Sequence, residues 1–272
     1  MGAVEVGGPH RARLMTEEIA RHGALDVVTV DGFDALGVHA VVTTRSGGVS
    51  IGPYASLNLG GHVGDDPNSV GENQARLAAQ MGVAPDALVI ANQVHGAAVA
   101  VVRRGAEPGD VDVLLTTDPS IALCVLVADC VPAVLVDPIA GVLAVAHAGW
   151  RGVAAATMRA AIEGARALGA EPARCYAYLG PCISPRGYEV GEEVARAFAA
   201  AGCGDDVVAD GPGRYRADLA AACTRQLLAC GVPTRHVTTS SSSTDGGQRF
   251  FSDRATRPCG RFAIASRLQG RS

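Results

Sequence analysis

The hydrophobic pattern of the chain is dominated by one long apolar stretch over residues 121–152, which polar residues interrupt at only a few positions. Within it, runs of Val, Leu, Ile and Ala predict three buried strands over residues 121–128, 132–137 and 141–147, because each run has the length of a strand. Asp, Pro and Gly in residues 137–141 predict the turn between the last two strands. Since these runs leave no polar face, we expect the strands to be covered on both sides.

Elsewhere the pattern predicts strands and helices that follow one another along the chain. Further strands are predicted over residues 38–45, 88–93, 98–103, 110–117, 175–179, 237–240, 250–253 and 262–268, with 98–103 pairing back on 88–93. Helices are predicted over residues 68–81 with Asn68 as the N-cap, over 153–168, 188–200 and 218–230, and as a short element capped by Thr16.

The order of these elements indicates the fold class. No linker separates two cores and no internal repeat is present, so residues 33–270 are predicted to form a single α/β domain with mixed sheets flanked by helices. Residues 1–32 are predicted to be a partly irregular N-terminal segment, in which Met15 is an alternative start.

Composition and charge narrow the classes of function. Charged residues make up 18% of the 272 residues and the net charge is -4, which leaves no basic surplus to attract nucleic acid or anionic lipid. Asp129, Pro132 and Asp137 interrupt the apolar stretch, so it is not a membrane span, and residues 2–14 lack the apolar core of a secretory signal. We therefore expect a cytoplasmic protein that acts on a small molecule. The eight cysteines contain no CxxC pair, and most are expected to be small buried hydrophobes.

Three residues at predicted strand ends are candidates for catalysis. His95, Cys130 and His147 supply two imidazoles and one thiolate, which is a three-ligand zinc set with the fourth position left for water or substrate. Zinc in such a site lowers the pKa of bound water to roughly 7. A metal-free alternative is open at this stage, in which Cys130 is a nucleophile and His147 is its base.

Anion binding is predicted at two places. Arg45 precedes a long loop over residues 46–66 that begins with Ser and two glycines, and a guanidinium beside exposed amides can hold an anion. An ordinary surface loop is the alternative, since Gly-rich turns are common. Arg151 and Gly152 precede the predicted helix over 153–168, whose free amides would face whatever binds beside His147.

Several motifs, taken in their order along the chain, resemble one bacterial family. They are TTRSGGVS, NQVHG, ADC, HAGWRG, GPCIS and FFSDR, at residues 43–50, 92–96, 128–130, 147–152, 180–184 and 250–254. Together they resemble the YfiH-like family, whose members are described as laccase-domain proteins, multicopper polyphenol oxidases, purine nucleoside phosphorylases or, in one branch, a peptidoglycan-editing factor. The resemblance implies sheets packed between helical layers, in the order α/β/β/α, as in the catalytic domain of cytotoxic necrotising factors.

The resemblance also implies site residues. It implies a zinc ion held by His95, Cys130 and His147, with copper possible by substitution. The candidate substrate or phosphate ligands are Arg45, Asn58, Gln93, Arg151 and Cys182. The chain departs from the family pattern in two places: Ser243-Thr244 stands where Cys-Thr is usual, and FFSDR replaces FFSYRR.

Among the activities of the resembling family, nucleoside chemistry fits the residues best. A laccase needs several copper ions and many histidines, generally in HxH pairs, whereas this chain has seven histidines and no HxH. We therefore expect a zinc-dependent purine nucleoside phosphorylase that acts on adenosine, inosine and methylthioadenosine and also deaminates adenosine. The alternatives are an amidase that edits a peptidoglycan precursor and a non-enzymatic partner of the division machinery; oligomeric state is not predicted.

Overall fold

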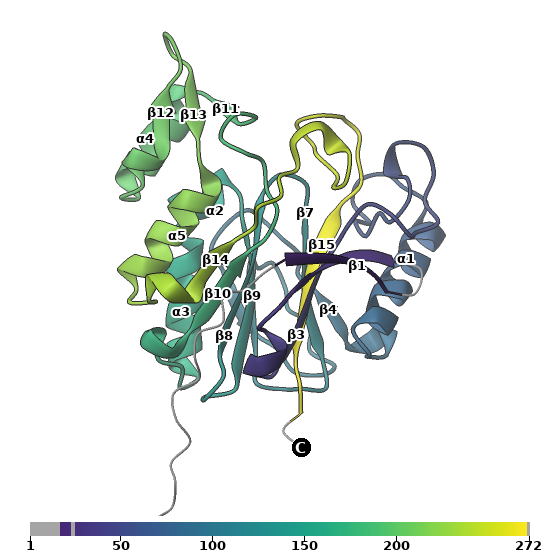
Figure 1. Cartoon of the computed structure of the whole chain (residues 1–272). Helices are drawn as coiled ribbons and strands as arrows, with labels where there is room; N and C mark the ends of the chain where they lie inside the picture. The colour runs from purple at the N-terminus through teal and green to yellow at the C-terminus, as the bar shows by residue number, and fades with distance from the viewer. Residues whose placement is uncertain (1–16, 23–24, 271–272) are drawn as a thin grey trace, which may run out of the picture.

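Two six-stranded sheets lie face to face and form the centre of the molecule (Figure 1). The computed structural model describes residues 17–22 and 25–270. The first sheet has the order β1 (Glu17–His22), β2 (Leu25–Val30), β3 (Val38–Thr43), β15 (Phe262–Leu268), β7 (Ala122–Val127) and β4 (Leu88–Ile90). The second has the order β14 (Val237–Thr239), β10 (Tyr176–Leu179), β8 (Val131–Asp137), β9 (Val142–Ala148), β6 (Val113–Thr116) and β5 (Val99–Val101).

Helices cover the outer face of each sheet. Helix α1 (Pro67–Gln80) packs on the first sheet, where Leu77 meets Cys124 and Leu126 of β7. The second sheet is covered by α2 (Trp150–Ala154), α3 (Thr157–Ala167) and α5 (Leu219–Ala229), with α4 (Glu192–Ala200) beside them. A small three-stranded sheet is formed by β11 (Glu189–Val190), which precedes α4, and by β13 (Tyr215–Ala217) and β12 (Val207–Ala209), which follow it. The predicted α/β/β/α order is confirmed.

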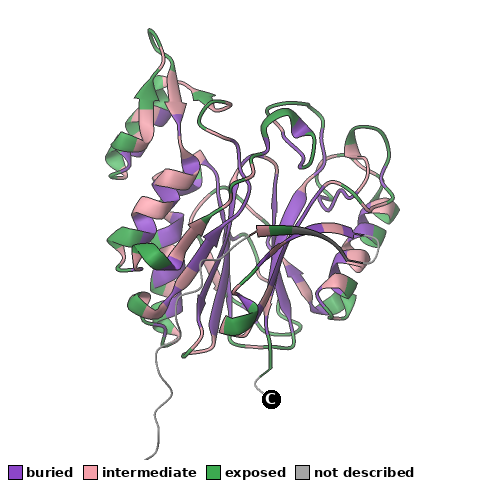
Figure 2. Ribbon diagram, viewed as in Figure 1, coloured by how far each residue is buried: buried purple, intermediate pink, exposed green. Residues whose placement is uncertain are grey.

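The apolar stretch forms the two central strands of the second sheet, β8 and β9, and strand β7 of the first sheet, between β15 and β4; every residue of these three strands is buried (Figure 2). Alternate residues of β7 face opposite ways: Val125 lies in the core between the sheets, whereas Cys124 lies under α1. Strands with apolar neighbours on both faces need no polar residues, which explains why the sequence pattern does not alternate. The predicted turn is also present, with the amide of Gly141 donating to the carbonyl of Asp137 at 2.9 Å.

Two predictions about helices are wrong. Residues 17–22 form strand β1, not a helix after Thr16, because they pair antiparallel with β2 along their whole length. The helix predicted over 153–168 is split into α2 and α3, since Ala156 has a left-handed φ of 60° that an α-helix cannot continue. Residue 16 and the predicted irregular residues 1–14 lie outside the described residues.

Other boundaries shift, and two strand predictions fail. The N-cap of α1 is Asp66, whose carboxylate accepts from the amides of Asn68 and Ser69. Strand β5 does not pair back on β4 but joins the other sheet beside β6, so the loop between them crosses from one sheet to the other. Residues 250–253 form no strand, and residues 189–190 form β11 ahead of α4. Within the described ranges, no helix is both long and apolar enough to cross a membrane.

Candidate active site

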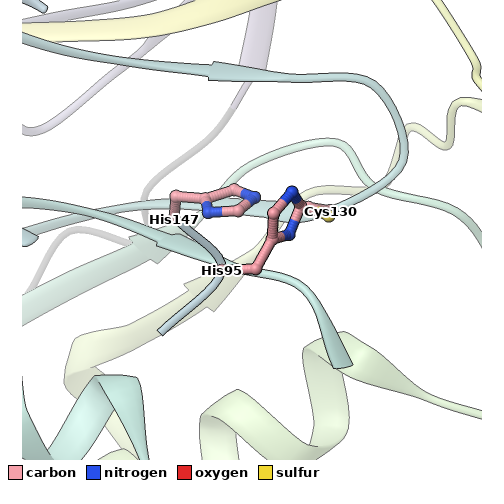
Figure 3. A group of neighbouring side chains, drawn as sticks. All are labelled: His95, Cys130 and His147. Atoms are coloured by element: carbon pink, nitrogen blue, oxygen red, sulfur yellow. The ribbon is translucent and has the colours of Figure 1, made fainter. Parts of the chain in front are cut away.

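The three candidate ligands meet at one end of the two sheets (Figure 3). Strands β8 and β9 are antiparallel, and Val131 pairs with Ala148, so the start of one strand lies beside the end of the other. This register brings Cys130 next to His147, and the loop between β4 and β5 supplies His95. The three ligand atoms lie within 4.8 Å of one another. His147 is buried, Cys130 is half-buried and His95 is exposed, so the cluster opens toward solvent on one side.

A buried carboxylate fixes the orientation of His147. Asp112 Oδ1 accepts from His147 Nδ1 at 2.8 Å, which leaves Nε2 of that ring to face Cys130 and His95. Asp112 also accepts from the backbone amides of His95 at 3.0 Å and Gly96 at 2.6 Å. The fully buried side chain of Asp112 therefore positions both His147, on the second sheet, and the loop that carries His95.

The cluster has the electrostatics of a metal site. Burial alone raises the pKa of the Cys130 thiol, but the neighbouring His147 and His95 outweigh burial and lower the pKa to about 6. Burial likewise lowers the pKa of His147, whereas Cys130 and Asp112 raise it to about 9. The two side chains therefore share a proton as a thiolate–imidazolium pair, and a cation can take the place of that proton.

The absence of a side chain at Gly149 keeps the space between the three ligands open. A Cβ at this position would lie 2.8 Å from Cys130 Sγ and 3.3 Å from His95 Nδ1. Any larger residue would therefore fill the space among the donor atoms. Two imidazoles and a thiolate around such a space fit a borderline-soft cation such as zinc.

The cluster lies in a cavity of about 650 Å³ whose other walls carry many cations. The cavity is lined by four arginines: Arg151, Arg254, Arg257 and Arg261. His62, Trp150 and the carboxylates of Asp129 and Asp253 line it as well. Arg151 stacks on Trp150, with its Cζ atom 4.3 Å from the ring centroid. Among the described residues it has no hydrogen-bond or ion-pair partner, so its guanidinium is available to an anion.

The other predicted binding residues are divided between the cavity and its surroundings. Gln93 and Arg151 line the cavity. The Gln93 side-chain amide also pairs with the backbone of Leu126 at 2.7 and 2.8 Å, which fixes the start of its loop. Asn58 is buried outside the cavity wall, and its Oδ1 accepts from the backbone amide of Arg261 at 2.8 Å. It therefore supports an arginine that does line the cavity.

Arg45 and Cys182 are not among the described residues that line the cavity. The Arg45 guanidinium donates to the carbonyls of Ala55 at 2.9 Å and Gly247 at 2.6 Å and stacks on Phe251, so two loops use its donors. Cys182 is buried, and burial raises the pKa of its thiol. Arg151 and Gly152 were predicted to precede a helix over residues 153–168. They lie instead within α2, which begins at Trp150 and is only five residues long.

Sequence reasoning missed Asp112, the arginine that ends the FFSDR motif (Arg254) and the two arginines that follow it (Arg257 and Arg261). Asp129, which was noted in the sequence only as an interruption of the apolar stretch, is a buried carboxylate that accepts from Thr244 Oγ1 at 2.5 Å and from the backbone amide of Arg254 at 2.7 Å. Because Asp129 directly precedes Cys130, these bonds hold the segment that carries the arginines next to the cluster. The dense spacing of arginines over residues 254–261 was the one available signal for this wall.

Comparison with known proteins gives the family. A family model described as multi-copper polyphenol oxidoreductase laccase matches residues 39–269. The chain belongs to this family. The resemblance inferred from the motifs is confirmed. Within the described residues, His95, Cys130 and His147 are the one group of three or more His, Cys, Asp or Glu side chains that could hold a metal ion.

Relatives within this family carry another activity in their names. The chain is 43% identical over 229 residues to "Purine nucleoside phosphorylase ORF3" of Streptomyces griseus, covering 83% of this chain and 92% of the relative. It is 47% identical over 199 residues to a purine nucleoside phosphorylase of Deinococcus radiodurans, covering 72% and 77%.

Solved structures of similar proteins have the same fold. YlmD from Geobacillus stearothermophilus superposes with a TM-score of 0.86 at 32% identity, covering 94% of this chain and 100% of that one. The hypothetical protein YfiH of Bacillus licheniformis gives a TM-score of 0.85 at 28% identity, covering 89% and 96%. The architecture described above is therefore the family's fold.

Proposed function

We propose that the protein is a zinc-dependent purine nucleoside phosphorylase that cleaves adenosine, inosine and methylthioadenosine with inorganic phosphate. The observation that carries this proposal is that one cavity contains both the His95–Cys130–His147 cluster and the unpaired guanidinium of Arg151. The names of the relatives support the same activity.

In this reaction an oxygen of phosphate forms a bond to C1′ of the ribose while the bond from C1′ to the purine nitrogen breaks. The bonding electrons leave with the purine, which takes up a proton, and the products are the free base and ribose 1-phosphate. Arg151 binds the phosphate dianion through charge-assisted hydrogen bonds, and stacking on Trp150 holds the guanidinium in the cavity wall. The aromatic ring and the apolar wall at Leu126 and Val127 provide surface for the purine.

His95, Cys130 and His147 would hold the zinc ion, and Asp112 keeps His147 Nε2 directed at it. When bound, zinc supplies a Lewis acid with one coordination position open to the cavity. Copper competes for such a nitrogen and sulfur site, so any oxidase activity would come from the exchanged metal.

A second activity, hydrolytic deamination of adenosine to inosine and ammonia, is proposed at the same site. The observation that favours it is the ligand number, because three protein ligands on the wall of a substrate cavity are also the arrangement of zinc deaminases.

The test is an assay of zinc-loaded protein with adenosine over a phosphate titration, with adenine, ribose 1-phosphate and inosine measured separately. Ribose 1-phosphate should equal the sum of adenine and of hypoxanthine, which is released from any inosine that is cleaved in turn, and should rise with phosphate, whereas inosine should form without it. A parallel incubation with a muramyl-serine precursor tests the editing alternative. Cleavage of that precursor, with adenosine left intact, would refute the proposed function.

A further inference from the structure

The charge of the cavity is set largely by one carboxylate at a position where the family motif departs. Asp253 stands where the resembling FFSYRR motif has tyrosine, and its side chain lines the cavity. Its Oδ2 forms an ion pair with Arg257, and its Oδ1 lies 3.4 Å from a guanidinium nitrogen of Arg261. Asp253 therefore pairs with two of the four cavity arginines, and its single negative charge offsets one of their positive charges.

Arg254 and Arg261 also have contacts outside Asp253. Arg254 donates to the carbonyl of Glu189 at 3.0 Å and stacks on Tyr188. Arg261, besides contacting Asp253, donates to the carbonyls of Cys259 and Gly260. Within the part of the chain that the structure describes, Arg151 is thus the one cavity arginine without a polar partner. The cavity is equipped for a single phosphate group.

We propose that Asp253 makes the cavity selective for uncharged nucleosides and against nucleoside 5′-monophosphates. This inference rests on the proposed function, in which the inorganic phosphate occupies Arg151. A nucleotide would bring a second dianion into the same cavity, where Arg257 and Arg261 are already paired and the Asp253 carboxylate repels it. Specificity then comes from a repulsive element and not from an additional contact with the nucleoside.

Trp150 allows binding to be measured by rapid mixing, before adenosine is turned over. It is the one tryptophan of the chain and it lines the cavity, so its fluorescence reports ligands there. In saturating inorganic phosphate, which occupies Arg151, adenosine and adenosine 5′-monophosphate are titrated against the zinc-loaded wild type and against Asp253→Asn. Since that substitution removes the negative charge that pairs with two guanidinium groups, the affinity for the monophosphate relative to adenosine should rise about tenfold to hundredfold.

The matched control is Asp86→Asn, which also removes one negative charge and frees an arginine, Arg104, but outside the cavity. It should leave the affinity ratio at the wild-type value. Asp253→Tyr installs the residue that the family motif carries and gives the second test should the asparagine variant fail to fold; it should raise the ratio as well. Asp253→Glu keeps the charge and should not.

Three results would overturn the proposal: a wild type that binds the monophosphate as tightly as adenosine, an unchanged ratio in the folded Asp253 variants, or no adenosine binding at all. Loss of the proposed function is distinguishable, because phosphorolysis is measured separately. If adenosine binds and the ratio shifts but no ribose 1-phosphate forms, charge selection stands and the phosphorylase assignment fails.

Discussion

Replacement of Asp112 by asparagine should weaken metal binding, because no orientation of the new amide satisfies its three donors. If Oδ1 continues to accept from His147 and the amide of His95, the new NH₂ group points at the amide of Gly96, 2.6 Å from the present oxygen. If the amide is flipped, its NH₂ group faces His147 Nδ1. The imidazole then carries its proton on Nε2, which is the nitrogen required by the metal.

The magnitude follows from these contacts. Loss of a carboxylate that orients a ligand histidine typically lowers metal affinity about tenfold to hundredfold, or about 1.4–2.8 kcal/mol. One buried donor left without an acceptor should lower the free energy of unfolding by about 1–3 kcal/mol even without metal. The assays are zinc competition with a chelator and urea unfolding of the metal-free protein.

Asp137→Asn is the matched control for this experiment. Asp137 is also a fully buried aspartate that accepts backbone amides, here from Ile139, Ala140 and Glu171, and it lies at the far end of β8. It should lower stability without changing zinc affinity. Equal zinc affinity in the wild type and Asp112→Asn would refute the argument that Asp112 orients His147.

The remaining predictions concern phosphate, the ligand space and pH. Arg151→Ala should weaken apparent phosphate affinity about tenfold to hundredfold in initial-rate assays. Arg45→Ala removes contacts to two loops, so it should lower the melting temperature and leave phosphate affinity within about threefold. The reverse pattern would place the anion site at Arg45. Gly149→Ala should reduce zinc content after dialysis, because its Cβ would lie 2.8 Å from Cys130 Sγ; full retention would contradict the packing argument. Although burial opposes it, the Arg174 contact and the backbone amides lower the pKa of Asp137, so its stabilisation is present above the unfolded pKa of about 4 and lost as pH falls through the folded pKa. The difference in unfolding free energy between the wild type and Asp137→Asn should therefore shrink from pH 7 to pH 3, and a constant difference would show that the charge does not contribute.

The central layers of the fold could be predicted from sequence because local apolar runs determine them. Strands β7, β8 and β9 are buried on both faces, so their composition alone separates them from surface elements. Strand β1 could not be predicted in this way. Its sequence, EEIARH, has no strand pattern, and pairing with β2 decides its conformation. The split between α2 and α3 had no local signal either, since alanine at position 156 favours a continuous helix.

The site was predictable to the extent that its residues lie at strand ends. Cys130 and His147 are brought together by the hairpin of two predicted strands, and His95, which follows another predicted strand, was a candidate for the same reason before the motif resemblance pointed to it. Asp112 was missed because it lies inside a predicted strand and its partner is 35 residues away. The arginine wall was missed for a related reason, since only the tertiary contact between Asp129 and the backbone of Arg254 brings that segment to the cluster.

The measurement that tests the central claim most directly is a titration of the metal-free protein with zinc while phosphate-dependent release of ribose 1-phosphate from adenosine is followed. The account predicts that activity rises linearly and reaches its maximum at about one zinc ion per chain, as expected for a single three-ligand site. The His147→Ala variant should remain folded and inactive throughout the titration, because its core is large and the ligand lies at a strand end. Full activity in the metal-free wild type would contradict the account and favour Cys130 as a nucleophile.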